Sequence, residues 1–349
     1  MKSSFQAISW TDAGLRLLDQ RRLPHAEIYL DFVDATTVAE AIRDMVVRGA
    51  PAIGITAAYA VVLAAQQHTT NSPGDWRAPL QRDMQRLAAA RPTAVNLVWA
   101  LERMQACLST AGEMPVAALL EEARHIHAED IKANQRMGEY GTNLINKGDS
   151  LLTHCNAGSL ATGGYGTALG VVRSAWAAGK AHTIFAGETR PWLQGARLTA
   201  WELLQDGIPV TLITDSAASS LMQSGQVQWV ITGADRVAAN GDVINKIGTC
   251  QLAVACRYYG VKMMVVAPLS TLDMAMPDGS QVTIEQRSAT EVLSLAGQAV
   301  AASGATAWNP AFDVTPAGLV DYLVTEAGVI EAPSHEKLVA LHSSTNRQD

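Results

Sequence analysis

VQWVITGADRVAANGDVINKIGT, residues 227–249, begins with an apolar run typical of a buried parallel strand and then becomes polar. The run ends shortly before Asp235, so a carboxyl group stands where the strand ends. The pair Asn245-Lys246 follows a turn, and Thr249 is a candidate N-cap for the next helix. Ligands of open α/β sheets bind beyond the carboxyl ends of the strands. We therefore expect Asp235, Asn245 and Lys246 to lie in a pocket, although a solvated turn would explain these residues about equally well.

On both sides of this stretch, short apolar runs alternate with longer helical segments, a pattern typical of an α/β fold. The sequence predicts strands at 150–154, 183–186, 210–213, 227–231 and 261–267. It predicts intervening helices at 163–178, 191–205, 217–223 and 251–259. For such a run the strand order 3-2-1-4-5-6 dominates, which makes the first and fourth strands neighbours. Cys155, which follows the first strand, is then expected at the same sheet edge as Asp235.

A thiol and a carboxyl at one edge can share the work of a proton transfer. To donate a proton near neutral pH, Asp235 would need a pKa raised well above the ordinary value of about 3.9, which a dry pocket provides. A cysteine in an arbitrary protein is more often a small buried apolar side chain. Chemistry at Cys155 is therefore a hypothesis on these grounds alone.

The first 148 residues have a helical period, apart from a small antiparallel cap expected at 5–10, 15–18 and 27–30. Thr37 is expected to cap a helix at 38–47. Further helices are predicted at 52–67, 76–90, 96–108 and 115–147. The predicted organisation is a mainly helical domain at 1–148, a Rossmann-like parallel-sheet domain at 149–330 and a C-terminal tail at 331–349.

The junction RGAPAIG, residues 48–54, has features that an ordinary corner between two helices does not need. Gly49 permits backbone N–H groups to approach an anion, a new helix begins near Ala50, and Arg48 stands beside both. Arg91, ahead of another predicted helix, is a candidate for the same anion. We interpret the junction as a phosphate site, whereas an ordinary helix–Gly–Pro–helix corner remains the simpler alternative.

Composition excludes several classes of protein. The chain has 349 residues and a formal net charge of −7, which argues against a general nucleic-acid-binding surface. Its four cysteines lack the spacing of a disulfide scaffold or a zinc site, so we expect reduced thiols and no metal. Neither a signal peptide nor an uninterrupted membrane-spanning stretch is recognisable. We expect a cytoplasmic protein that does not bind a membrane.

The glycine-rich cluster after Cys155 supports a rival interpretation. Gly164, Gly166 and Gly170 approximate a dinucleotide-binding fingerprint but are spaced one residue too widely, and Glu188 stands where a ribose-binding acid would lie. A nicotinamide-dependent oxidoreductase is therefore an alternative. It ranks lower because Cys155 and Asn156 occupy the turn itself, and the cluster can equally enclose a sugar phosphate.

Five blocks together resemble the methylthioribose-1-phosphate isomerase family, and a sixth extends the resemblance to about Val329. The blocks are RGAPAIG (48–54), THCNAGSLATGGYGTALG (153–170), ETRPWLQGARLTAWEL (188–203), TDSAASSLM (214–222), GADRVAANGDVINKIGT (233–249) and NPAFDVTPAGLVDYLVTEAGVI (309–330). This superfamily also holds ribose-1,5-bisphosphate isomerases and regulatory subunits of the translation-initiation exchange factor. Single blocks are moderately specific, but their combination is strong.

The resemblance implies an aldose–ketose isomerase of methionine salvage that acts on a small sugar phosphate without a cofactor. It implies that Asp235 is the proton donor and that Cys155 stabilises the transition state. The substrate-binding residues that it implies are Arg48, Gly49, Ala50, Arg91, Gln194, Asn245 and Lys246. It further implies a homodimer. Ribose 1,5-bisphosphate stays open as an alternative substrate, although no extra cluster of Arg and Lys is recognisable for a second phosphate.

Overall fold

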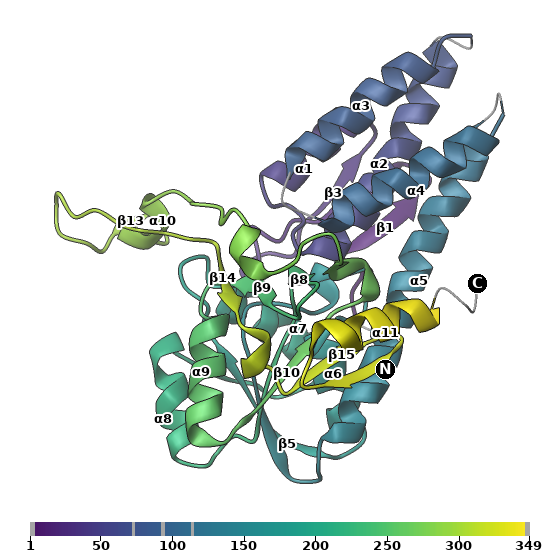
Figure 1. Cartoon of the computed structure of the whole chain (residues 1–349). Helices are drawn as coiled ribbons and strands as arrows, with labels where there is room; N and C mark the ends of the chain where they lie inside the picture. Colours follow the sequence, from purple (N-terminus) through teal and green to yellow (C-terminus); the bar gives the residue numbers. More distant parts are fainter. Residues whose placement is uncertain (1–3, 72–73, 92–94, 113–114, 346–349) are drawn as a thin grey trace. The chain divides into compact units, whose positions relative to one another are not determined.

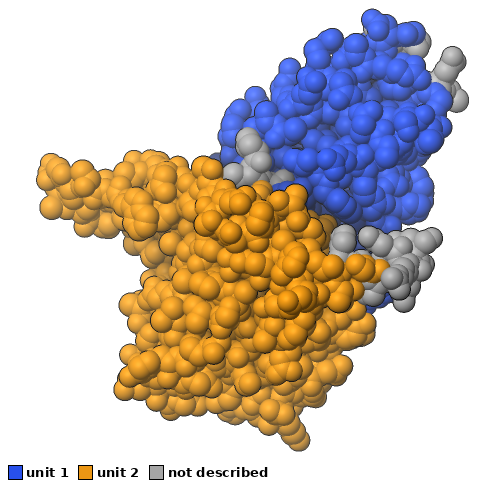
Figure 2. Space-filling view, viewed as in Figure 1, with its two compact units in different colours: residues 1–136, 157–170 blue, residues 137–156, 171–349 orange. Residues whose placement is uncertain are grey.

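The computed structural model describes residues 4–71, 74–91, 95–112 and 115–345. The chain forms two compact units, which Figure 2 shows in separate colours. Unit 1 comprises Met1–Arg136 and Ala157–Gly170, and unit 2 comprises Met137–Asn156 and Val171–Asp349. Each unit therefore contains two separate stretches of chain. The domain limits predicted from the sequence, 1–148, 149–330 and 331–349, stay a prediction.

Unit 1 opens with the small antiparallel sheet that the sequence predicts. Its strands are β1 (Ile8–Thr11), β2 (Gly14–Leu18) and β3 (Tyr29–Phe32), in the order β1-β2-β3. The middle strand carries fully buried leucines at positions 15, 17 and 18, which pack it onto the helices. This part of the predicted fold is confirmed.

The helices of unit 1 surround α2 (Ala50–Asn71), which contacts α1 (Ala35–Arg43), α3 (Arg77–Ala90) and α4 (Val95–Thr110). The long helix α5 (Pro115–Leu144) follows (Figure 1), and its residues from Met137 onward belong to unit 2. Among the described helices, α2 alone is long and apolar enough to cross a membrane, and 83% of its most apolar window is buried inside the protein. It is therefore the core helix of this unit.

The N-cap of α1 is Asp34, and the prediction of Thr37 in this role is wrong. The Asp34 carboxylate accepts a hydrogen bond from the Thr37 backbone N–H at 2.8 Å. The Thr37 hydroxyl bonds back to Asp34. Both residues are suitable caps by type, and the carboxylate at the earlier position starts the helix one turn sooner.

Unit 2 contains a seven-stranded sheet with the order β16-β15-β10-β7-β4-β5-β6. Its strands are β4 (Asp149–Thr153), β5 (Ala181–Gly187), β6 (Thr211–Ile213), β7 (Trp229–Thr232), β10 (Lys262–Val266), β15 (Tyr322–Thr325) and β16 (Gly328–Glu331). Only β16 pairs antiparallel with its neighbour. The predicted order 3-2-1-4-5-6 is confirmed, with β15 as the sixth strand and β16 as an additional edge strand.

The first three helices of this sheet are shorter than predicted, and the last begins two residues earlier than predicted. They are α6 (Ala168–Ala177), α7 (Ala200–Gln205), α8 (Ala218–Gln223) and α9 (Thr249–Tyr259). A π-helical turn, Gly195–Thr199, precedes α7, so the single α-helix predicted at 191–205 is wrong in its first half. Helices α8 and α9 pack together (Figure 1), and their apolar residues join those of β4, β7 and β10 in one core cluster.

The polar stretch after β7 forms a hairpin, which the sequence does not predict. Strands β8 (Arg236–Ala238) and β9 (Val243–Lys246) pair antiparallel around the predicted turn, and β9 also pairs with β14 (Phe312–Thr315). With β11 (Leu272–Asp273) they form a second, four-stranded sheet. The next helix is capped by Gly248 at φ +103°, so Thr249 is its first residue and not its N-cap as predicted.

The chain ends with further small elements of unit 2. These are α10 (Thr290–Leu293), the β12 (Ser294–Leu295) and β13 (Gln298–Ala299) hairpin, and α11 (His335–Thr345). Leu338 of α11 is fully buried and belongs to the core cluster. His335 Nδ1 lies 3.0 Å from the Ala239 carbonyl oxygen. The last helix thus packs onto its unit.

Candidate active site

Cys155 and Asp235 follow the ends of β4 and β7, which are parallel neighbours in the sheet with Thr153 opposite Ile231. The two residues therefore leave adjacent strands at the same edge, as the sequence predicts. Cys155 is buried, at 9% exposure, whereas Asp235 is half-buried. The Asp235 backbone N–H donates to the Ile244 carbonyl at 3.0 Å, which ties the start of the hairpin to β9.

Asn245 and Lys246 end β9 and are held by their surroundings. The Asn245 amide donates to the Thr249 hydroxyl at 2.9 Å. Lys246 Nζ donates to the Ala311 carbonyl at 3.0 Å and lies 4.5 Å from the centre of the Phe312 ring. Both residues are thus fixed by α9 and β14, in the same unit as Cys155 and Asp235.

Asp313 is a site residue that the sequence analysis did not identify. One carboxylate oxygen, Oδ2, accepts hydrogen bonds from the backbone N–H groups of Gly248 at 2.7 Å and Cys250 at 3.1 Å. Burial raises its pKa to about 6, against the opposing effect of these bonds and of Lys246. The other oxygen, Oδ1, is buried and has no hydrogen-bond partner in the described part of the chain. The signal for Asp313 in the sequence is an acidic residue within a mostly apolar stretch, residues 309–316.

Gln194 is buried, at 6% exposure, and lies at the start of the π-helical turn. Its amide oxygen finds no hydrogen-bond partner among the described residues, so it can bind a hydroxyl or amide of a ligand. The preceding residues are fixed by Asp215, whose carboxylate accepts from the backbone N–H groups of Thr189 at 2.8 Å and Arg190 at 2.7 Å.

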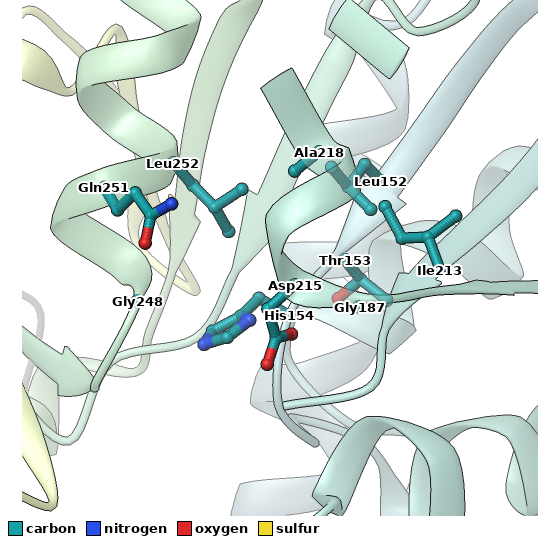
Figure 3. Close-up of a pocket in the computed structure, with 10 residues that line it drawn as sticks. All are labelled: Leu152, Thr153, His154, Gly187, Ile213, Asp215, Ala218, Gly248, Gln251 and Leu252. Carbon is teal, nitrogen blue, oxygen red and sulfur yellow. The ribbon is translucent and has the colours of Figure 1, made fainter. Parts of the chain in front are cut away.

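A small pocket, partly open to solvent, lies at the carboxyl ends of β4, β5 and β6. Figure 3 shows His154 and Asp215 side by side among its lining residues, which are Leu152, Thr153, His154, Gly187, Ile213, Asp215, Ala218, Gly248, Gln251 and Leu252. His154 Nε2 donates to the Ile247 carbonyl at 2.9 Å, and burial lowers its pKa. A neutral imidazole with its proton on Nε2 therefore lies next to Cys155 in the chain.

The predicted phosphate site lies in unit 1. Gly49 has φ +98°, and a Cβ there would lie 2.6 Å from the backbone of Ala161, so only glycine fits. Ala50 is the first residue of α2, while Arg48 and Arg91 are half-buried, the latter as the C-cap of α3. The helix N-terminus, the glycine and an arginine thus occur together as predicted.

The glycine-rich cluster is held within unit 1 by side chains of α5. The Asp130 carboxylate accepts from the Gly163 N–H at 2.7 Å, and the Asn134 amide donates to the Gly164 carbonyl at 3.0 Å. His127 bonds the Gly163 carbonyl at 2.8 Å. Because residues 154–167 separate β4 from α6, the cluster is not the tight strand–helix turn that a dinucleotide fingerprint requires.

No three His, Cys, Asp or Glu side chains of the described residues are grouped so that they could hold a metal ion.

The chain is similar to known proteins over most of its length. The model of the initiation factor 2 subunit family matches residues 46–332. The methylthioribose-1-phosphate isomerase of Thioalkalivibrio sulfidiphilus is 60% identical over 336 residues, which are 96% of each chain. The crystal structure of 5-methylthioribose 1-phosphate isomerase from Pyrococcus horikoshii has a TM-score of 0.91 and 41% identity, over 97% of this chain and 96% of that one. A structure described as the delta subunit of initiation factor eIF-2B from A. fulgidus has a TM-score of 0.86 and 41% identity, over 96% and 99%.

Proposed function

The chain belongs to the methylthioribose-1-phosphate isomerases, aldose–ketose isomerases of methionine salvage within the initiation factor 2 subunit family, and we propose that Asp235 and Cys155 carry its chemistry. The substrate is 5-methylthioribose 1-phosphate and the product is 5-methylthioribulose 1-phosphate. The observation that supports the assignment is the departure of both residues from neighbouring strands at the carboxyl edge of the sheet.

Because C1 carries the phosphate, the substrate cannot form a free aldehyde when its ring opens. The reaction must therefore proceed without an aldehyde intermediate. Asp235 donates its proton to the ring oxygen while the bond from C1 to that oxygen breaks. The Cys155 thiolate then takes the proton from C2, which leaves an enol with a double bond between C1 and C2. The thiol exchanges its proton with the solvent and then donates a proton to C1, and the C2 hydroxyl loses its proton to the Asp235 carboxylate. The C2 ketone forms and both groups regain their starting states.

A hydride shift from C2 to C1, with Cys155 only polarising the reacting carbons, is the competing route. Product made in heavy water distinguishes the two. Deuterium at C1 is expected for the enol route, whereas its complete absence would mean that the hydrogen moves without exchange.

The substrate phosphate is bound by Arg48 and the backbone N–H groups of Gly49 and Ala50, with Arg91 and Lys246 as further cations. A charge-assisted hydrogen bond contributes about 1.5–3 kcal/mol. Gln194 and Asn245 bind sugar hydroxyls through their side-chain amides. The fixed position of Asn245 and the unpartnered oxygen of Gln194 support these roles.

Two substitutions test the assignment. Asp235→Asn removes the proton donor and should lower kcat by about 10²–10⁴-fold with little change in KM. Arg48→Ala should chiefly raise KM, because it removes binding that the substrate and the transition state share. Unchanged turnover in Asp235→Asn would overturn the acid role.

A bisphosphate substrate requires a second anion site near C5 of the sugar. Parallel assays on methylthioribose 1-phosphate and ribose 1,5-bisphosphate decide between the substrates, and we expect turnover of the first alone. We further propose that the enzyme is a cytoplasmic homodimer that works without a cofactor. Retention of an NAD absorbance by the purified protein would contradict the last point.

A further inference from the structure

Cys155 has a backbone conformation that is unusual for its type. Its φ is +59°, in the left-handed region that side-chain-bearing residues seldom adopt. Such a conformation persists only where the surrounding structure enforces it. Two of the contacts that do so here come from side chains.

Two buried threonines hold the peptide groups of Cys155. Its backbone N–H donates to Thr189 Oγ1 at 2.8 Å, and its carbonyl accepts from Thr199 Oγ1 at 2.5 Å. Both threonines are 0% exposed. Each hydroxyl has one proton, and the Thr189 proton goes to the Gly187 carbonyl at 3.2 Å. The two hydrogen bonds of Cys155 are therefore compatible with the single hydroxyl proton of each threonine. We call Thr189 and Thr199 together the threonine clamp.

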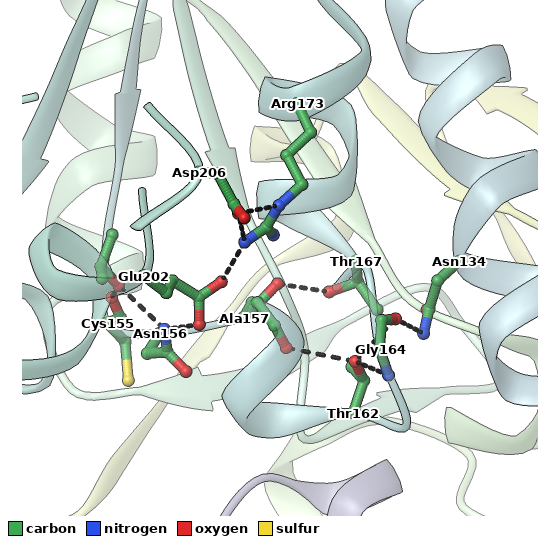
Figure 4. Close-up of polar contacts among 12 residues, drawn as sticks. Asn134, Cys155, Asn156, Ala157, Thr162, Gly164, Thr167, Arg173, Glu202 and Asp206 are labelled. Atoms are coloured by element: carbon green, nitrogen blue, oxygen red, sulfur yellow. Dashed lines mark hydrogen bonds and ion pairs between the residues drawn. The ribbon is translucent and has the colours of Figure 1, made fainter. Parts of the chain in front are cut away.

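A buried polar network extends from Thr199. Asn156, the residue after the thiol, donates its amide to Thr199 Oγ1 at 3.2 Å and to Glu202 Oε2 at 3.1 Å. Glu202 Oε1 accepts from Arg173 at 3.0 Å, and Arg173 also pairs with Asp206 (Figure 4). Arg173 and Glu202 are 1% and 0% exposed. Connected networks of this kind fix one arrangement of their members.

The same π-helical turn serves two residues of the site. Thr199 is its last residue, while Gln194 stands at its start. Widened helical turns of this type occur frequently at functional sites. Cys155 and Gln194 are consequently held by one rigid element, although they lie far apart in the sequence.

We propose that Thr199 and Thr189 are positioning residues that set the direction of the Cys155 thiol, with Asn156 and Glu202 holding Thr199 in place. This inference rests on the proposed role of Cys155. Neither threonine touches the reacting atoms in this account, and each acts through the backbone of Cys155. Their removal should therefore affect the chemical step more than substrate binding.

The central test replaces Thr199 by Val, which has nearly the same shape but no hydroxyl. Thr199→Val should lower kcat about 10–100-fold and change KM by less than about threefold, because a displaced thiol reacts poorly. Thr199→Ser retains the hydroxyl and should recover kcat to within about threefold of wild type. Thr271→Val is the matched control, since Thr271 is also 0% exposed but its hydroxyl has no partner among the described residues.

A second variant, Thr189→Val, keeps the inference testable if Thr199→Val does not fold. It removes the acceptor of the Cys155 N–H and should give the same split between kcat and KM. The inference is overturned if a folded clamp variant retains kcat within about threefold, or if Thr199→Ser loses as much as Thr199→Val. Cys155→Ala separates the two hypotheses, because unchanged kcat in that variant would refute the role of the thiol itself.

Discussion

Asp313 shows how one carboxylate organises a binding segment. It accepts hydrogen bonds from the N–H groups of Gly248, the N-cap of α9, and of Cys250. It therefore fixes the start of α9, directly after Asn245 and Lys246. Burial raises its pKa to about 6, which means that ionising it in the native protein has a free-energy cost. This arrangement makes the native protein sensitive to pH.

The direction of this effect follows from proton binding. In the unfolded chain the Asp313 carboxyl ionises near its ordinary pKa, but in the native protein it keeps its proton up to about pH 6. Between these pH values the native state binds more protons than the unfolded state. The contribution of Asp313 to the free energy of unfolding therefore falls as pH rises. Compared with Asp313→Asn, the wild type should lose about 1 kcal/mol of stability between pH 5 and pH 7.5. Urea unfolding of both proteins at the two pH values measures this, and a constant difference between them would contradict the prediction.

At the residue scale, the sequence predicts the positions of those residues whose placement follows from strand order or from turn chemistry. Cys155 and Asp235 could be assigned to one edge because parallel strands present their carboxyl ends together. Asp313 could not be found in this way, since its role depends on the pairing of β14 with β9. The acidic residue within the apolar stretch 309–316 marks a position in the sequence, but not the segment with which its strand pairs.

The π-helical turn Gly195–Thr199 is the element on which the site most depends. It packs so closely on the end of β5 that a Cβ on Gly195 would lie 1.7 Å from the Gly187 carbonyl oxygen. No side-chain movement relieves such a contact, because both partners are backbone. The fit explains why a glycine occupies this position.

Gly195→Ala should lower the free energy of unfolding by at least about 3 kcal/mol, or prevent folding, since the turn must move away from β5. Gly318→Ala is the matched control, because a Cβ at Gly318 meets nothing within 4 Å. Denaturation midpoints of the two variants provide the comparison. Equal midpoints would mean that the turn can shift without cost.

At the element scale, the predicted helices and strands differ from the structure where helical and extended patterns are short. The region 191–205 has the period of one helix, and the insertion that creates the π-helical turn does not change its apolar pattern. The β8–β9 hairpin is not predicted from the sequence, because its strands have only three and four residues. The turn at 240–242 was nevertheless predicted, since Gly241 adopts φ +93° as turn chemistry requires.

On the scale of the molecule, the C-terminal helix contributes to the core of its unit. Leu338→Ala should lower the free energy of unfolding by about 2–5 kcal/mol, because the side chain is 0% exposed. Val339→Ala, one position further along α11, should cost less than about 1 kcal/mol because Val339 is 41% exposed. Thermal or urea unfolding distinguishes them. Equal effects would show that α11 does not pack as described.

The proposed homodimer has its own test. Leu295 in β12, and Val300 and Trp308 between β13 and β14, are 44%, 61% and 80% exposed, so these apolar side chains are available to a second chain. Sedimentation equilibrium over a range of concentrations should give a particle of two chains. A mass of one chain at micromolar concentration would contradict the proposal.

The segment Ala157–Gly170 belongs to unit 1, although the residues directly before and after it belong to unit 2. A gene fragment that ends at residue 148 would therefore lack the strip on which Gly49 packs and which Asp130 holds. Recombination that exchanged the first half of this enzyme for that of a distant relative would have to exchange the segment Ala157–Gly170 as well. A junction at residue 148 would therefore separate Gly49 and Asp130 from the residues that they contact.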